Sequence, residues 1–132
     1  AISSGIRRFR EHTSTPNIRF VINVHPRDFV SLLKHAKCLV GNSSAGIKEA
    51  SFFGTPVVNI GTRQTGRTRS ANVADVDYDF LAIKSAIEKQ IGHGPYEPSL
   101  IYCKPETSKR IRKILKTAPL YIQKRFFDQS LT

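Results

Sequence analysis

Short apolar runs alternate along this chain with segments of helical spacing, and this alternation limits the possible folds more than any other feature. The apolar runs are rich in Val, Ile and Leu and read as strands; they cover residues 18–24, 37–41, 55–61 and 71–76. Strands of this composition, separated by helices, form parallel sheets that are covered on both faces. We therefore expect an α/β fold, a Rossmann-like parallel sheet of about four strands with right-handed crossovers.

The segments between and around these runs have the marks of helices. Residues 26–35 begin with Pro26, which suits the first helical turn, and residues 44–53 end before Gly54, a common residue just beyond a helix. Asp79 can cap the next helix. The other expected helices cover residues 2–12, 80–91, 105–117 and 119–128. Because a Rossmann half begins with a strand and this chain begins with a helix, the sequence predicts the later part of a domain.

Length and composition predict one globular domain. The chain has 132 residues, 39% hydrophobic and 23% charged, enough for a substantial core. No apolar stretch approaches the roughly 20 residues that a membrane span needs, so we expect no membrane contact. Cys38 and Cys103 are too few for a disulfide framework, and a cytoplasmic location is the expectation. The histidines show no ligand spacing, so we expect neither a metal nor another cofactor.

A net charge of +11 raises nucleic acid as a partner. The excess lies outside the centre of the chain: residues 41–80 hold 4 Lys and Arg against 4 Asp and Glu, whereas residues 81–132 hold 10 against 4. In residues 108–116 the apolar side chains share one helical face and the bases the other, as on a solvated amphipathic helix. A basic nucleic-acid-binding module without enzymatic activity, acting through residues 104–125, remains the alternative, but no aromatic stacking platform supports it.

Polar residues follow three of the expected strands, at the end where a parallel sheet collects its ligands. Val24 ends the first strand with His25 beyond it, Ser43 and Ser44 follow the second, and Arg63 follows the third. The serines precede a helix whose first N–H groups and dipole attract anions. Such a turn is a typical phosphate site, although a serine pair by itself is also an ordinary N-cap.

Two kinds of charged side chain suit a nucleotide at this turn. Glu49 lies too far into the helix to cap it, and a carboxylate repels phosphate, so its plausible use is to accept hydrogen bonds from ribose hydroxyls. Arg63 and Arg67 would balance phosphate charge from the next loop. Taken singly, Glu49 is an ordinary surface charge on a helix, and the two arginines are ordinary solvated loop residues. Taken together with the serine turn, they favour a site for a nucleoside diphosphate. The sequence has neither GxxxxGK[ST] nor GxGxxG, so we expect no P-loop and no dinucleotide.

The stretch GNSSAGIKEASFFGTPVVNIGTRQTGR, residues 41–67, closely resembles the UDP-N-acetylglucosamine 2-epimerase family, specifically its hydrolysing branch. The resemblance extends more loosely to nearly the whole chain. It implies a glycosyltransferase-B arrangement, in which two Rossmann-like domains face one another and the C-terminal one holds most of the UDP. It further implies that Ser43 and Ser44 hold the diphosphate, Glu49 the ribose, and Val24 the uracil through its backbone, with Arg63 in the UDP site.

The resemblance also implies how the chain is organised. Residues 1–118 would be the incomplete UDP-binding C-terminal domain, and residues 119–132 a helix and tail that cross to a missing N-terminal Rossmann-like domain. That crossing would explain the apolar Phe126 and Phe127. We expect a UDP-sugar as ligand and a homo-oligomer as the assembly.

The expected reaction belongs to amino-sugar and sialic acid biosynthesis. UDP-N-acetylglucosamine and water, or a diacetamido-sugar analogue and water, would give the 2-epimerised sugar and UDP by elimination of UDP and hydration of the glycal. The family's acid and base groups lie upstream of anything that matches here, and residues 41–67 contain one carboxylate, Glu49, already given to ribose. We therefore expect no catalytic residues in this chain and no activity from it alone.

Overall fold

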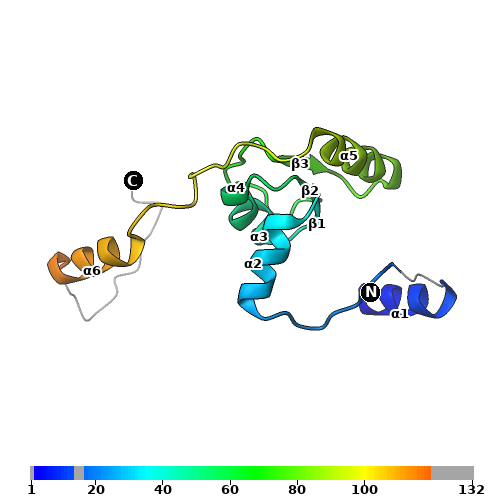
Figure 1. Ribbon diagram of the computed structural model, residues 1–132, viewed down its shortest axis with the longest axis horizontal. Coiled ribbons are helices and arrows are strands. Elements are labelled where there is room, and N and C mark those ends of the chain that lie inside the picture. The colour runs from blue at the N-terminus through cyan, green and yellow to red at the C-terminus, as the bar shows by residue number, and fades with distance from the viewer. Residues whose placement is uncertain (1, 14–16, 120–132) are drawn as a thin grey trace, which may run out of the picture. The chain divides into compact units, whose positions relative to one another are not determined.

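A computed structural model describes residues 2–13 and 17–119 (Figure 1). Internal contacts divide the chain after Leu32 into two compact units, residues 1–32 and residues 33–132. The elements in order are α1 (Ile2–His12), α2 (Pro26–His35), β1 (Leu39–Gly41), α3 (Ser44–Ile47), α4 (Glu49–Phe53), β2 (Val57–Ile60), β3 (Val73–Val76), α5 (Phe80–His93) and α6 (Thr107–Thr117).

The strands form one parallel sheet in the order β1-β2-β3. Leu39 pairs with Val57, and Asn59 pairs with Asp75, so all three strands end at the same edge. The predicted α/β fold with a parallel sheet is confirmed, with three strands among the described residues rather than about four.

The missing strand is the one predicted for residues 18–24, and this part of the prediction is wrong. No described residue pairs with this segment as a strand, and Val21 and Ile22 are 71% and 107% exposed. An apolar run provides side chains for a strand, but the strand forms only where a neighbouring backbone accepts and donates its hydrogen bonds. Residues 18–24 have the composition of a strand without that neighbour.

The core of the second unit lies where β2 meets the helices beside it. Leu33, Ala50 and Val57 are buried together, with Leu39, Phe53 and Val73 packed against them. Val58 is fully buried and its side chain points to the opposite face from Val57, as strand geometry requires. Helix α5 contacts β2 and β3. The central strand therefore has no face open to water.

The helix predicted for residues 44–53 is divided into α3 and α4 at Lys48. The Ser51 hydroxyl donates to the Lys48 carbonyl at 2.7 Å, a local hydrogen bond that competes with the regular helical ladder. The predicted end at Gly54 is confirmed: Gly54 has a φ of 68° and its N–H reaches the carbonyls of Ala50 and Ser51.

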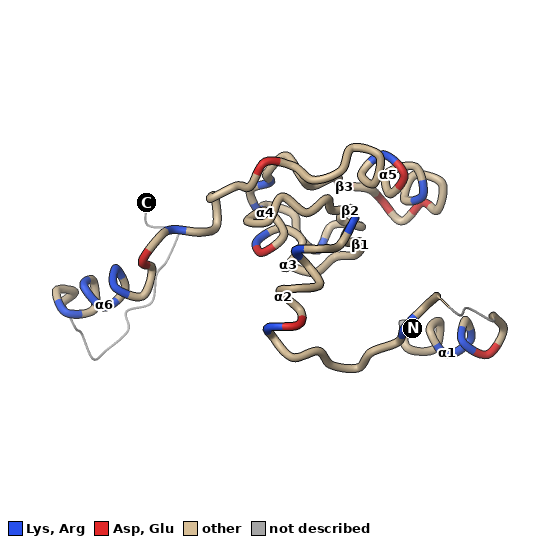
Figure 2. Tube along the Cα trace, in the orientation of Figure 1, with Lys and Arg blue, Asp and Glu red and all other residues tan. Residues whose placement is uncertain are grey.

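Helix α6 places basic residues along an exposed surface (Figure 2). Ile111, Ile114 and Leu115 are exposed on the same helix. The predicted crossing helix of residues 119–128, with Phe126 and Phe127, lies outside the described residues beyond position 119. None of the helices that the structure describes is long and apolar enough to cross a membrane.

Gly54 provides a test of the packing around the sheet. A Cβ at this position would collide with the Tyr96 carbonyl, and the backbone is left-handed. We expect Gly54→Ala to lower the free energy of unfolding by about 1–3 kcal/mol in chemical denaturation. Gly92→Ala is the control, since a Cβ there meets nothing within 4 Å and alanine favours helix. Equal stability of the two variants would contradict the described packing.

Candidate functional site

The loop after β1 forms a short turn into α3. Ser43 has extended backbone angles and its Oγ accepts a hydrogen bond from the Ala45 N–H at 3.3 Å, so it is the N-cap of α3. Ser44 is the first residue of that helix, and Ala45 and Gly46 behind it are buried. Gly46 lies directly over the sheet, because a Cβ on it would come within 2.9 Å of Val57 Cγ1. The turn therefore presents the serine hydroxyls while its backbone stays against the strands.

The loop after β2 is a series of tight turns. Thr65 Oγ1 donates to the Thr62 carbonyl at 2.7 Å, and the Arg67 N–H donates to the Gln64 carbonyl at 3.3 Å. At its start Gly61 has a φ of 73°, and a Cβ on it would collide with the ring of Tyr78. The exposed Tyr78 ring thus covers the backbone where the loop leaves the sheet.

The two loops meet at Asn42. Gln64 Nε2 donates to the Asn42 carbonyl at 2.8 Å, and Gln64 is only 3% exposed. Arg63 Nη1 lies 3.5 Å from the same carbonyl and 3.4 Å from Asn42 Oδ1. Since Asn42 immediately precedes Ser43, these contacts fix the cationic loop beside the serine turn.

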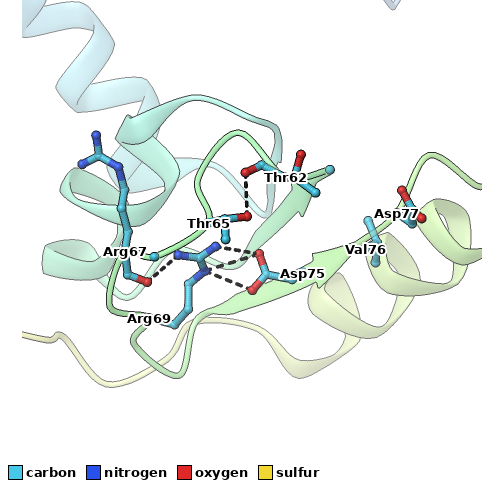
Figure 3. Close-up of a pocket in the computed structure, with 9 residues that line it drawn as sticks. Thr62, Thr65, Arg67, Arg69, Asp75, Val76 and Asp77 are labelled. Atoms are coloured by element: carbon cyan, nitrogen blue, oxygen red, sulfur yellow. Dashed lines mark hydrogen bonds and ion pairs between the residues drawn. The ribbon is translucent and has the colours of Figure 1, made fainter.

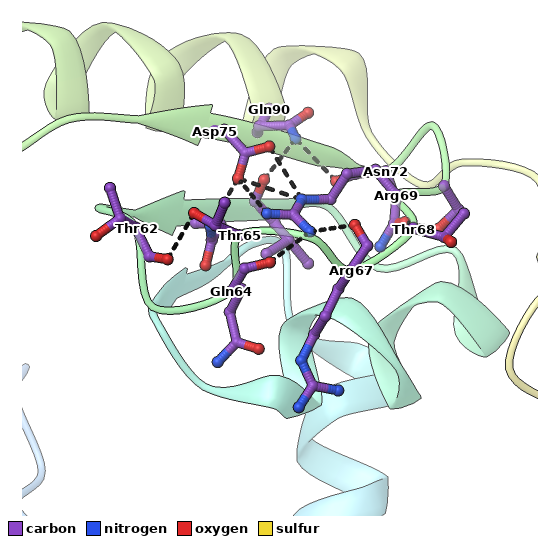
Figure 4. Close-up of polar contacts among 12 residues, drawn as sticks. Thr62, Gln64, Thr65, Arg67, Thr68, Arg69, Asn72, Asp75 and Gln90 are labelled. Carbon is purple, nitrogen blue, oxygen red and sulfur yellow. Dashed lines mark hydrogen bonds and ion pairs between the residues drawn. The ribbon is translucent and has the colours of Figure 1, made fainter. Parts of the chain in front are cut away.

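The structure brings together some of the predicted site residues. Ser43, Ser44 and Arg63 lie around the Asn42 junction. Arg67 lies in the same loop as Arg63, and Figure 4 shows its side chain extended away from its own carbonyl. Glu49 is exposed at the first position of α4.

The prediction that Val24 ends a strand is wrong, because residues 18–24 form no strand; Val24 lies in the first unit, and the other predicted site residues lie in the second. The Val24 N–H is bonded to Asn23 Oδ1 at 2.9 Å.

Sequence reasoning missed an ion pair behind the second loop. Arg69 Nε lies 3.0 Å from Asp75 Oδ2, and Arg69 Nη2 donates to Asp75 Oδ1 at 3.2 Å. Arg69 Nη1 donates to the carbonyls of Gln64 at 2.9 Å and Arg67 at 2.6 Å. Asn59 on β2 donates from Nδ2 to Asp75 Oδ1 at 2.6 Å. One guanidinium thus joins the third strand to the inside of the loop (Figure 4).

A pocket of about 500 Å³ lies beside this ion pair (Figure 3). Its lining residues come from the loop after β2 and from the end of β3; they are Gly61, Thr62, Thr65, Gly66, Arg67, Arg69, Asp75, Val76 and Asp77. Two arginines and two aspartates therefore share one hollow with threonine side chains. Among the residues described, no group of three or more His, Cys, Asp or Glu could hold a metal ion.

Two signals in the sequence pointed to this network. Asp75 is a charged residue within the apolar run of β3, and Asn59 is a polar residue in β2. A buried polar side chain such as Asn59 requires a partner, and Asp75 on the neighbouring strand is a charged acceptor within its reach. The sequence does not say which of several nearby cations or amides provides the partner of Asp75.

The Arg69 contact changes the acidity of Asp75. Burial alone would raise the pKa of the carboxyl, but the hydrogen bonds from Arg69 and Asn59 and the charge of Arg69 outweigh it and lower the pKa below its ordinary value. Because the folded-state pKa is below the unfolded-state pKa, the carboxylate stabilises the fold above the unfolded-state value. This contribution is lost as the pH falls through the folded-state value.

The family model described as UDP-N-acetylglucosamine 2-epimerase matches residues 3–116. The chain belongs to this family. The match includes the whole stretch 41–67 on which the resemblance rested, and the α/β fold with a parallel sheet is consistent with a glycosyltransferase-B type.

Relatives with assigned names agree with this membership. The chain is 37% identical over 114 residues to UDP-N,N'-diacetylbacillosamine 2-epimerase (hydrolyzing) of Legionella pneumophila, covering 86% of this chain and 30% of the relative. It is 36% identical over 122 residues to UDP-N-acetylglucosamine 2-epimerase of Neisseria meningitidis, covering 88% and 31%. It is 48% identical over 59 residues to GDP/UDP-N,N'-diacetylbacillosamine 2-epimerase (hydrolyzing) of Campylobacter jejuni, covering 45% and 15%. The chain thus spans less than a third of the length of these relatives.

Acid titration tests the state of Asp75. As the pH falls below about 4, the free energy of unfolding of the unmodified protein should fall more steeply than that of Asp75→Asn, which has no carboxylate to protonate. Urea denaturation across this range measures both slopes. Glu88→Gln removes an exposed carboxylate of α5 and controls for the loss of one charge. Parallel curves for the unmodified protein and Asp75→Asn would show that Arg69 does not hold the carboxylate in solution.

Proposed function

We propose that this chain is the UDP-sugar-binding portion of a hydrolysing UDP-N-acetylglucosamine 2-epimerase. Membership of the family and relatives named as hydrolysing enzymes support the proposal. The observation that carries it is the junction at Asn42, where Arg63 and Gln64 attach the cationic loop to the serine turn. A diphosphate needs both parts at once: hydrogen-bond donors from the turn and positive charge from the loop.

Each predicted residue then has a role in holding UDP. Ser43 and Ser44 donate from their hydroxyls to the diphosphate, and Arg63 and Arg67 neutralise its charge from the neighbouring loop. Glu49, exposed at the start of α4, accepts hydrogen bonds from the ribose hydroxyls. The roles of Glu49 and of Val24, whose backbone would meet the uracil, rest on the family resemblance.

The chemistry requires groups beyond these residues. Eliminating UDP needs a base that removes the proton at C2 of the sugar, and hydration of the resulting glycal needs a group that returns a proton to the opposite face. Within residues 41–67 the only carboxylate is Glu49, which is proposed to hold the ribose. We therefore assign the acid and base to a second, N-terminal Rossmann-like domain, in keeping with relatives more than three times as long as the matched part.

The proposed enzyme consumes water and a UDP-linked 2-acetamido sugar and yields UDP and the free 2-epimer. Relatives named for N-acetylglucosamine and for diacetylbacillosamine make either sugar a candidate substrate. We place residues 1–118 in the UDP-binding domain and residues 119–132 in the crossing segment of a cytoplasmic homo-oligomer.

Product analysis tests the function directly. The protein at its full length should release UDP from UDP-N-acetylglucosamine or from the diacetamido analogue, whereas purified residues 1–132 should release none above background. Turnover by residues 1–132 would show that the catalytic groups lie within this chain. Salt-sensitive binding of DNA or RNA at physiological ionic strength, without UDP binding, would instead favour the nucleic-acid module.

Glu49 provides a test of the ribose assignment. Glu49→Ala in the full-length protein should weaken UDP binding by about 1–3 kcal/mol, the typical cost of a lost charge-assisted hydrogen bond. Calorimetry should give a comparable loss for UMP, which shares the ribose. Glu88→Ala, at another exposed carboxylate, on α5, is the matched control and should bind UDP normally. Unchanged UDP affinity in Glu49→Ala would make Glu49 a surface charge only.

A further inference from the structure

The loop between β2 and β3 lacks the support that helices and strands give to their residues. Residues 61–72 contain no helix or strand, and Arg63 and Arg67 within them are exposed. An exposed side chain on an irregular loop holds a ligand well only if other contacts fix the backbone beneath it. The question is which contacts do so here.

The side chain of Arg69 links two other residues of this loop to the sheet. Its Nη1 donates to the carbonyls of Gln64 and Arg67, so the guanidinium lies inside the turn that carries the two exposed arginines. The side chain of Arg69 is 24% exposed, compared with 50% for its partner Asp75. A guanidinium with donors in a fixed plane can hold several acceptors in one geometry, which a flexible ammonium cannot.

Asp75 anchors that guanidinium to the sheet. It lies on β3, receives Nε and Nη2 of Arg69, and is itself held by the buried Asn59 of β2. The ion pair therefore attaches the loop to β3 and, through Asn59, to β2.

The opposite side of the loop reaches the serine turn. The buried Gln64 donates from its side chain to the Asn42 carbonyl, while its own carbonyl accepts from Arg69. A continuous series of contacts therefore runs from Asp75 through Arg69 and Gln64 to Asn42, next to Ser43. Other bonds hold the two ends of the loop: the Gly61 N–H donates to the Val76 carbonyl, and the Tyr102 hydroxyl donates to the Thr68 carbonyl. Displacement of Arg69 would therefore free the turn of residues 64–67 from β3 and loosen the junction at which the diphosphate is proposed to bind.

We propose that Arg69 and Asp75 are positioning residues for the diphosphate: their ion pair holds the loop so that Arg63 and Arg67 face the Ser43 turn, without touching the ligand themselves. This inference rests on the proposed function, because it concerns the same UDP site. It assigns a role to two residues that neither the sequence motif nor the expected ligand contacts included.

The substitution Asp75→Asn distinguishes a positioning role from a simple effect of charge, because the two predict opposite changes in UDP affinity. Asp75 is an anion near the proposed phosphate site, so replacing it with asparagine makes the site more positive and, by electrostatics alone, tightens UDP binding. If Asp75 acts through Arg69, the same nearly isosteric change releases the guanidinium and weakens binding. The sign of the change separates the two explanations.

The experiment compares UDP affinity by calorimetry in the full-length protein. Asp75→Asn should weaken UDP binding by roughly three- to tenfold, and Arg69→Lys, which keeps the charge but loses the planar fork, should weaken it similarly. Glu88→Gln is the control, because it removes a carboxylate paired with Lys84 on the exposed surface of α5, away from the loop. It should bind UDP like the unmodified protein. Unchanged or tighter binding in Asp75→Asn would overturn the proposal.

Hydrogen exchange distinguishes positioning from a general loss of stability. In Asp75→Asn the amides of Thr65 and Arg67, which close the turns of the loop, should exchange faster, while the Val58 amide in the central strand should not. Equal acceleration at all three sites would also overturn the proposal. If the unmodified protein fails to bind UDP, the proposed function fails; if it binds UDP and only Glu49→Ala weakens it, the positioning role alone fails.

Discussion

The pairing of β2 on both sides is the constraint on which the second unit depends. Val57–Ile60 is bonded to β1 along one edge and to β3 along the other, and Val57 and Val58 bury its two faces. Because the three strands run in the same direction, the chain must leave β1 and β2 at one edge of the sheet. The serine turn therefore lies next to the cationic loop because the strands run in the same direction. The hydrogen bond from Gln64 to the Asn42 carbonyl joins the two loops.

Local patterns were sufficient to predict much of this fold. The apolar spacing of residues 26–35 and 80–91 predicted α2 and α5, and Gly54 ended its helix as expected because only a left-handed residue fits there. Residues 18–24 show the limit of such patterns, since a strand depends on a distant partner that composition does not specify. The division of the helix at Lys48 was equally hidden, because the Ser51 hydroxyl that bonds to the Lys48 carbonyl could have chosen another acceptor.

The candidate site likewise has a part that the sequence predicted and a part that it did not. The rule that ligands gather at strand ends correctly predicted that Ser43, Ser44 and Arg63 lie near one another, and their roles toward UDP remain predictions. The same rule failed for Val24, because no strand ends there. Gln64, Arg69 and Asp75 were not found, although Gln64 lies within residues 41–67 and the other two follow within eight residues. These residues matter because of the hydrogen bonds that they form with one another and with Asn42. The pairing of these donors and acceptors can be seen only once the loop and the two strands are placed together.

Tyr78 and Gly61 have a consequence for how this sequence can change over time. The tyrosine ring occupies the space that any side chain at position 61 would need, and the left-handed backbone there already disfavours other residues. A larger residue at position 61 would need the exposed Tyr78 ring to move aside, and even then it would strain the left-handed backbone. The backbone conformation is therefore a more lasting constraint than the ring, and glycine at position 61 should persist even where the residue at position 78 changes.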